Sequence, residues 1–318
     1  MARDLDVLCV GGLVCDFMIR PVDAGVFTRE VSYMDAAESN VGGDAANESI
    51  VMGKLGSRVA ILAEIGDDGT ANELRSVFAK AGVNTDHLVV RKNKKTRTNI
   101  VLIRPDGERH FVIFPNDFDE FCGDDLDYEL LPQAKIVSIG SIHHLPLLDP
   151  AIPGYLKAAK EAGCITSADM CPNLGNTPEE MVIESCKYLD YLIPSEGEMR
   201  DLFGENWTPE EAARTLRSWG VKNVVIKLGG KGCYIFNDTY DERVPAFPAK
   251  AIDTTGAGDS FAGGFLTGVL KGWDLKKCAI FGSATGCLAV QAIGANTGVK
   301  SYEQALAVAR TSPDWRDE

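Results

Sequence analysis

A glycine-rich segment, reading DTTGAGD from Asp253 to Asp259, combines residue types that can bind an anion and accept a proton. Small residues let the backbone approach a ligand and direct N–H groups at it, and the helix that follows adds a positive dipole at its N-terminus. Asp259 falls in the first turn of this helix, where it could act as a base for a hydroxyl that attacks a phosphate. The segment alone fits equally well a helix-capping Asp259 beside a tight turn.

Two common nucleotide-binding motifs are missing from the chain. No segment matches G-x-x-x-x-G-K-[S/T], so a P-loop is not expected. After the first strand-like run the chain reads GGLVCD from Gly11 to Asp16, which lacks the G-x-G-x-x-G of dinucleotide-binding proteins. An NAD-dependent dehydrogenase is therefore a poor interpretation.

Two further glycine-rich segments could contact a ligand. The first, VGGDAAN from Val41 to Asn47, enters a helix, and the Asn47 amide offers a donor and an acceptor that suit a hydroxyl. The second, KLGGKG from Lys227 to Gly232, follows a strand and could wrap a nucleotide. Glycine-rich turns of this kind are more often structural than functional.

Short runs rich in Val and Ile alternate with helical patterns over most of the chain. Because these runs do not alternate polar with apolar residues, they predict strands buried on both faces, as in a parallel sheet. The expected strands are Asp6–Gly11, Val59–Ile65, Ile136–Ile139, Ile165–Ala168, Tyr188–Ile193 and Val224–Lys227. The expected helices are Asp44–Leu55, Thr70–Ala81, Pro150–Ala162, Pro178–Cys186, Pro209–Trp219, Gly258–Lys271, Asp274–Ala292 and Ser301–Thr311. This order predicts a doubly wound, mostly parallel α/β sheet flanked by helices.

Two insertions break the alternation. Residues 17–40 contain the β-prone runs Phe17–Ile19 and Val31–Tyr33 but no convincing helix, and residues 98–114 form two β-prone runs around Asp106-Gly107, which predicts a hairpin. We expect one domain, residues 1–318, in which roughly 15–41 and 96–116 form a small β-sheet lid; separate surface hairpins are the alternative.

Composition and charge limit the partners and the compartment. The net charge of −14 disfavours nucleic acid and anionic membranes, so any phosphate site must be built locally. The first residues do not resemble a signal peptide, and no apolar run is long enough to span a bilayer, which predicts a cytoplasmic protein. The nine cysteines contain no C-x-x-C pair, and Cys9, Cys233 and Cys287 lie in apolar patterns, so reduced thiols are expected rather than disulfides or zinc ligands. On a strand, His143 and His144 would point to opposite faces, at the surface or a pocket rim.

Taken together, these segments resemble the ribokinase-like carbohydrate kinases, the phosphofructokinase-B type, from Val7 to about Gly298. The resemblance rests on the segment from Gly42 to Asn47 with Leu55-Gly56, on the segment from Asp253 to Asp259, and on the glycine-rich turn between them. It implies an α/β domain with a β lid over a sugar, ATP as the phosphoryl donor, Mg²⁺, and often a stimulating monovalent cation such as K⁺.

The resemblance also implies roles for individual residues. Asp259 matches the catalytic base, and the backbone amides of three residues before it match the anion hole: Gly256, Ala257 and Gly258. The sugar-binding positions of the family correspond to Asp16, Gly42, Gly43, Asn47 and Asn99. The ATP-binding positions correspond to Ser195, Lys227, Gly229, Gly232 and Ser283. Glu198 matches the glutamate that organises Mg²⁺ through water, and the monovalent-cation loop corresponds to Asp253, Val290, Ile293 and Ala295.

One position departs from the family pattern. The Asn-x-x-Glu motif of the family reads Ser195-Glu196-Gly197-Glu198 here, and the shorter serine side chain puts the contact to phosphate or metal-bound water in doubt.

We expect phosphorylation of a hydroxyl of a sugar or sugar acid, and three alternatives remain open. Arg97, Arg104 and Arg109 in the lid would suit a carboxylate or a phosphosugar, whereas the lid aromatics Phe17, Tyr33 and Phe111 would suit a nucleoside. A sugar-binding protein that has lost catalysis is the third alternative. The β-prone lid surface also predicts a homodimer formed through the lid.

Overall fold

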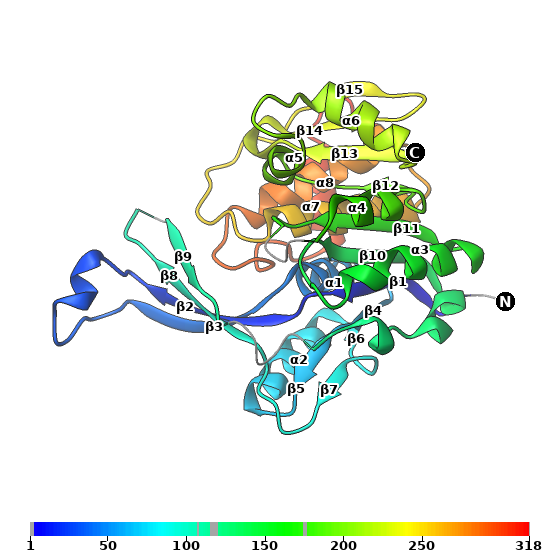
Figure 1. The fold of residues 1–318 in the computed structure, drawn as a ribbon. Coiled ribbons are helices and arrows are strands. Elements are labelled where there is room, and N and C mark those ends of the chain that lie inside the picture. Colours follow the sequence, from blue (N-terminus) through cyan, green and yellow to red (C-terminus); the bar gives the residue numbers. More distant parts are fainter. Residues whose placement is uncertain (1–2, 107, 115–119, 174–176, 318) are drawn as a thin grey trace.

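A nine-stranded sheet forms the centre of the computed structural model, which describes residues 3–106, 108–114, 120–173 and 177–317. Within these residues the strand order is β15-β14-β13-β12-β11-β10-β1-β4-β6 (Figure 1). The strands are β1 (Leu5–Gly11), β4 (Val59–Leu62), β6 (Val83–Asn84), β10 (Ala134–Ile142), β11 (Ile165–Met170), β12 (Tyr191–Leu192), β13 (Asn223–Lys227), β14 (Cys233–Phe236) and β15 (Asp241–Val244).

The sheet is parallel from β6 to β13, and only β14 and β15 pair antiparallel. The predicted mostly parallel sheet is therefore confirmed. The β14–β15 hairpin was not among the expected elements. It extends the sheet at the edge next to Lys227, the last residue of β13.

Helices cover both faces of the sheet and bury two apolar clusters against it. One face carries α1 (Asp44–Lys54), α2 (Gly69–Ala81), α7 (Ala257–Leu270), α8 (Leu275–Ala289) and α9 (Tyr302–Ala309). The other face carries α3 (Ile152–Glu161), α4 (Glu179–Cys186), α5 (Glu196–Phe203) and α6 (Pro209–Ser218). Every predicted helix is present, and α5 is an additional one. The doubly wound arrangement follows, because each buried strand needs apolar cover on both faces.

The two insertions pair into one separate sheet, as expected for a lid. Its strands are β2 (Val14–Arg20), β3 (Ala36–Gly42), β8 (Thr98–Ile103) and β9 (Arg109–Val112), in the order β3-β2-β8-β9. The parallel pairing of β2 with β8 joins the insertions, and the sheet projects from the main body (Figure 1). We call these four strands the lid. Gly107 of the predicted turn, and 115–116 at the end of the predicted lid, lie outside the described residues.

Two strand predictions are wrong in detail. The run Val31–Tyr33 lies in an exposed loop, and β3 forms instead from Ala36–Gly42, whose sequence AAESNVG has little β propensity. Its seven-residue pairing with β2 overrides that propensity. The run Val59–Ile65 is split, because β5 (Glu64–Gly66) leaves the main sheet and pairs with β7 (Val89–Arg91).

The histidine pair also differs from expectation. His143 follows the end of β10 with a positive φ of 75°, so it does not lie on a strand, and its side chain is buried. It lines a small cavity with Glu198 and Cys171, whereas His144 is half-buried. Cys9 and Cys233 are buried in the core, and Cys287 is half-buried. Among the described residues, no helix has both the length and the apolarity to cross a membrane.

Candidate active site

The N-terminus of α7 presents a tight backbone turn to a large cavity. Gly256 precedes the helix with a φ of 67°, and a Cβ at this position would lie 2.2 Å from the carbonyl oxygen of Ala295. Only glycine fits such a site, since both the conformation and the close approach exclude a side chain. The backbone of Ala257 and Gly258 then lines the cavity at the positive end of the helix dipole.

Asp259 lies in the first turn of α7 but does not cap it. No side chain caps this helix, and the carboxylate Oδ2 instead accepts a hydrogen bond of 2.7 Å from Nδ2 of Asn47. The capping interpretation is therefore wrong. Burial, followed by the charges of Asp44 and Asp169, raises the pKa of Asp259 well above its ordinary value, while Asn47 and Lys227 oppose the rise. A carboxylate with a raised pKa beside a helix N-terminus is suited to accepting a proton.

Asn47 lies in α1 and uses both ends of its amide within the protein. Its Nδ2 donates to Asp259, and its Oδ1 accepts from Nδ2 of Asn296 at 3.0 Å. The side chain predicted to contact a sugar therefore also holds the predicted base. The helix begins after Gly43, which has a φ of 92°. A Cβ at this position would lie 2.4 Å from the carbonyl oxygen of Gly12, so only glycine fits.

The lid contributes two neighbouring polar residues, Asp16 and Asn99, which we call the polar row. Asp16 of β2 and Asn99 of β8 are direct neighbours in the sheet, and Asn99 Nδ2 donates to Asp16 Oδ1 at 3.0 Å. Both side chains are buried, and within the described part of the chain Asn99 Oδ1 has no hydrogen-bond partner. A Cβ on Gly42 would lie 2.2 Å from Asp16 Oδ2, so glycine makes room for this carboxylate. Burial raises the pKa of Asp16, although Asn99 and two lid arginines oppose it.

The cavity at α7 has a volume of about 620 Å³ and brings together four of the five predicted ATP-binding residues. They are Lys227, Gly229, Gly232 and Ser283. The Ser283 hydroxyl is buried without a hydrogen-bond partner among the described residues, which fits a polar ligand in this cavity. Lys227 forms an ion pair with Asp169 of β11. Burial disfavours its charge, but Asp169 and Glu198 outweigh this effect and raise the pKa of Lys227, so it is cationic at neutral pH.

Ser195 and Glu198 lie beside this cavity rather than in its lining. They form a capping box at the start of α5, in which the Ser195 amide donates to the Glu198 carboxylate. The S-x-x-E spacing is a helix-start signal, so this sequence pattern could have predicted α5. The backbone of Ser195 also pairs with that of Lys227 in an isolated parallel β-bridge. The negative charge of Glu198 raises the pKa values of both Lys227 and Asp169.

The four residues matched to a monovalent-cation loop do lie together, but their oxygens already accept hydrogen bonds from donors within the protein. The Val290 carbonyl accepts from the Ile252 amide at 2.7 Å, and the Ile293 carbonyl accepts from the Thr297 hydroxyl at 2.5 Å. The Ala295 carbonyl accepts a longer bond from Ser260.

Both carboxylate oxygens of Asp253 in this loop accept hydrogen bonds as well. It accepts from Thr255 and from the amide of Gly294, and Nη1 of Arg109 lies 3.3 Å from its Oδ1. A guanidinium therefore lies on the acidic side of the loop, and each loop oxygen already accepts a hydrogen bond within the protein.

Sequence reasoning missed two residues of the site as functional positions, Asp169 and Asp44, and expected a different partner for a third, Arg109. Asp169 is the penultimate residue of the buried strand β11, and residues at the carboxyl ends of parallel strands are a general indication of a ligand site. Asp44 begins α1 and accepts hydrogen bonds from Ser141 and Cys171. Arg109 reaches from β9 of the lid to Asp253 and also donates to Thr254 at 3.1 Å. No local sequence pattern predicts that last contact.

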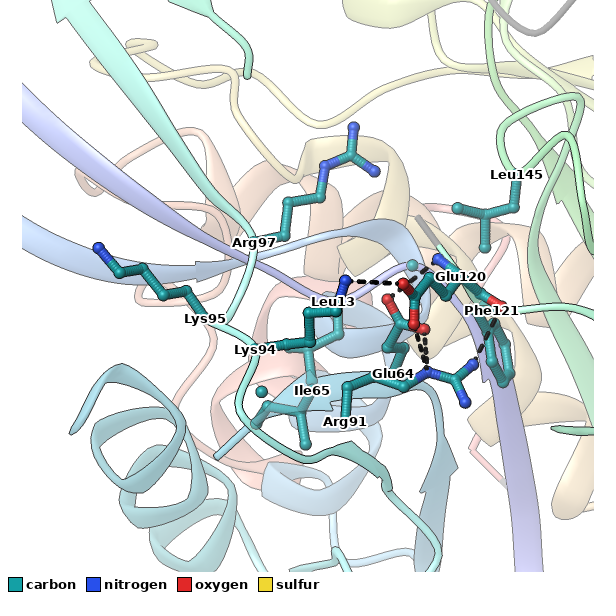
Figure 2. A pocket seen from close by; sticks show the side chains of 13 residues that line it. Leu13, Glu64, Ile65, Arg91, Lys94, Lys95, Arg97, Glu120, Phe121 and Leu145 are labelled. Atoms are coloured by element: carbon teal, nitrogen blue, oxygen red, sulfur yellow. Dashed lines mark hydrogen bonds and ion pairs between the residues drawn. The ribbon is translucent and has the colours of Figure 1, made fainter. Parts of the chain in front are cut away.

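A smaller cavity of about 30 Å³ lies at the base of the lid (Figure 2). Its ion pairs fix the chain that leads into β8: Arg91 contacts Glu64 at 2.6 Å, and Lys94 contacts Glu120 at 2.9 Å. Figure 2 shows Arg97 pointing away from this network. These ion pairs link β5, β7 and the segment that leads into β8, the strand that carries Asn99.

Comparisons with known proteins agree with this geometry. The model for the pfkB family of carbohydrate kinases matches residues 4–301. Fructokinase-2 of Solanum habrochaites is 30% identical over 319 residues, and the fructokinase of Solanum tuberosum is 30% identical over 312 residues, each with 94% of both chains covered.

Solved structures give the same result. A ribokinase from Thermotoga maritima is 27% identical with a TM-score of 0.81, covering 96% of this chain and 99% of that chain. A ribokinase from Arabidopsis thaliana, complexed with ribose and ATP, is 25% identical with a TM-score of 0.80, covering 98% of this chain and 100% of that chain.

Proposed function

We propose, because the chain belongs to the pfkB family of carbohydrate kinases, that it transfers the γ-phosphoryl group of ATP to a hydroxyl of a keto-sugar of the fructose type. That it is a carbohydrate kinase follows from the family and its fructokinase relatives. One observation carries the mechanism: Asp259 lies in the first turn of α7, directly after two residues that line the cavity, and its carboxylate accepts a hydrogen bond of 2.7 Å from Asn47.

In the proposed reaction, Asp259 takes the proton from the sugar hydroxyl as its oxygen attacks the γ-phosphorus. The bond between that phosphorus and the β–γ bridging oxygen breaks, and ADP leaves. The backbone amides of Gly256, Ala257 and Gly258 stabilise the negative charge of the transferred group, because they belong to the positive end of α7.

We assign sugar binding to Asp16, Asn99 and the glycine pair Gly42-Gly43. The free acceptor of Asn99 and the second oxygen of Asp16 can each accept a hydrogen bond from a sugar hydroxyl. A sugar acid is less well supported, since Arg104 pairs with Asp106 and Arg109 pairs with Asp253. The charges of these two lid arginines are thus already balanced within the chain.

The 620 Å³ cavity is assigned to ATP, with Lys227 near the phosphates, Gly229 and Gly232 along the nucleotide, and Ser283 toward the base. Glu198 would hold Mg²⁺ through water, because its charge already acts on Lys227 and Asp169 at the edge of the cavity. When bound, Mg²⁺ neutralises phosphate charge. A monovalent cation has no part in this proposal, because Arg109 already balances Asp253.

We further propose that two copies associate through the lid. Phe17, Ile100 and Val112 are neighbours across β2, β8 and β9, so they share one face of the lid, and none of them is buried. A small sheet with such an apolar face is stabilised by a second sheet. Light scattering at micromolar concentration should give the mass of a dimer, and a monomeric mass would contradict this part of the proposal.

The decisive test of the function is a coupled assay of ADP release with a panel of substrates. Fructose should give the highest kcat/KM, ribose a lower value, and keto-deoxy sugar acids and adenosine little activity. Preference for a sugar acid would indicate that the lid arginines bind the carboxylate of the substrate. Preference for adenosine would replace the keto-sugar with a nucleoside, and sugar binding without turnover would identify a homologue that has lost catalysis.

A further inference from the structure

We propose that Asn296 is a positioning residue that determines which end of the Asn47 amide faces Asp259. This inference rests on the proposed role of Asp259 as the base. Nothing in the sequence pattern singles out Asn296, which lies in the loop after α8.

The three side chains form a continuous chain of hydrogen bonds. Asn296 Nδ2 donates to Asn47 Oδ1 at 3.0 Å, and Asn47 Nδ2 donates to Asp259 Oδ2 at 2.7 Å. Asn47 and Asn296 are both buried, with 4% and 7% of their surface exposed. Water is therefore largely excluded from competing for these groups.

The chemistry of the amide makes the direction of this chain matter. Asn47 has one end that donates and one end that accepts, and Asp259 as a carboxylate only accepts. If Asn47 turned over, its carbonyl oxygen would face the carboxylate, and neither group could donate to the other. By donating to Oδ1, Asn296 stabilises the one orientation in which Asn47 supports the base.

Asn296 is itself held in place by α1, the helix that carries Asn47. Lys54 at the end of α1 donates from Nζ to the backbone carbonyl of Asn296 at 2.7 Å. Burial partly desolvates the ammonium group of Lys54, which strengthens this hydrogen bond and, together with the charge of Lys300, lowers the pKa of Lys54 to about 8. The helix therefore fixes the donor that orients its own asparagine.

This arrangement affects when Asp259 can accept a proton. The charged groups that face it are Asp44 of α1, Asp169 of β11 and Lys227 of β13; with burial, the two carboxylates raise the pKa of Asp259, while Lys227 and the Asn47 hydrogen bond lower it. Losing the hydrogen bond leaves the carboxyl protonated to a higher pH. The base is then unavailable over part of the working range.

The test is the pH profile of kcat for Asn296→Ala and Asn296→Leu, the second keeping the number and branching of the side-chain heavy atoms. Both should move the acidic limb to higher pH by about one to two units, as expected for losing one hydrogen bond to a charged group. At pH values below the midpoint of the wild-type limb, kcat should fall by about 10-fold or more. Thr297→Val, which loses a hydroxyl bond in the same loop without touching Asn47, should leave the position of the limb unchanged.

A double-mutant cycle separates positioning from general loop damage. In an Asn47→Ala background, Asn296→Ala should change kcat by less than about twofold, because its target is gone. An unchanged acidic limb in folded Asn296→Leu, or effects that multiply in the double mutant, would overturn the inference. If Asp259→Asn is inactive in that event, the proposed base still stands; if Asp259→Asn is active, the proposed function itself fails.

Discussion

The two halves of the site are built in different ways. The half that faces the nucleotide cavity comes from the core: α7, the end of β13 and the end of β11 place the half-buried Asp259 and Lys227 beside the buried Asp169. The half assigned to the sugar comes from the lid, which places Asp16 and Asn99 on strands that project from the body. Its tip is open to solvent, with Phe27 86% and Tyr33 93% exposed.

The two halves differ in how strongly their surroundings let charged groups interact. Fixed charges and dipoles act strongly only where water is excluded, and the packed core provides that environment at a cost in stability. A small sheet cannot bury many charges, but it can present a polar row whose spacing is set by strand register. We therefore expect changes in the core half to alter kcat and pH dependence, and changes in the lid half to alter KM.

The largest effect should come from the core half. Asp259→Asn removes the proton acceptor while keeping the shape of the side chain, so kcat should fall by about 10²–10⁴-fold. Calorimetry should show ATP binding unchanged. Because burial penalises the charge of Asp259, the variant should melt no lower than the wild type at pH 7. A variant that keeps a third of wild-type kcat would remove Asp259 from the mechanism.

The lid half should respond differently. Asp16→Ala leaves the hydroxyls of the sugar without a charged acceptor, so the sugar KM should rise by about 10²–10³-fold with little change in the KM for ATP. The control is Asp23→Ala in the lid tip, an exposed residue paired with Arg29, which should leave both constants unchanged. If the sugar KM of Asp16→Ala stays within threefold of wild type, the sugar does not bind at the polar row.

The stability cost of the core half should be visible in Glu48. This carboxyl is buried near Cys9, and burial raises its pKa to about 7. The unfolded chain loses this proton near its ordinary pKa, so the free energy of unfolding falls as pH rises from about 4.5 to 7. Glu48→Gln should therefore be more stable than wild type by about 2–3 kcal/mol at pH 8 and equal to it near pH 4. Denaturant titrations at the two pH values give the comparison, and equal stabilities at pH 8 would contradict it.

The smallest effect should appear where the halves meet. Arg109→Gln breaks the contact of the lid with Asp253 and Thr254, and kcat/KM should fall by about 10-fold. Wild-type activity should be the same in KCl and NaCl, and Arg104→Gln, whose exposed partner is Asp106, should behave like wild type. Strong activation of the wild type by K⁺ would show that Arg109 does not balance the loop.

How much could be predicted from the sequence differs between these regions. Most of the parallel strands, and every helix except α5, were identifiable because continuous apolar runs and helical periodicity are local signals. β3 was not, because its residues have low propensity and the strand exists only through pairing with β2. The capping box at Ser195 and Glu198 was a local signal of α5 that the sequence analysis did not use.

The sequence by itself determined the chemistry available at each end of the site. Glycines stand where only glycine fits, at Gly256 and Gly43, and a carboxylate follows at the start of α7. Glycine-rich turns and helix starts involve residues that are adjacent in the sequence, so they can be identified without knowledge of the tertiary structure.

Only the tertiary structure decided which groups meet. Asn47 lies 212 positions from Asp259 and 249 from Asn296, and Arg109 lies 145 from Thr254. Contacts across such separations depend on how the sheet, α1 and the lid pack together, and the pKa values of the site follow from that packing. Burial and the direction of a hydrogen bond are properties of the assembled core, which no local pattern specifies.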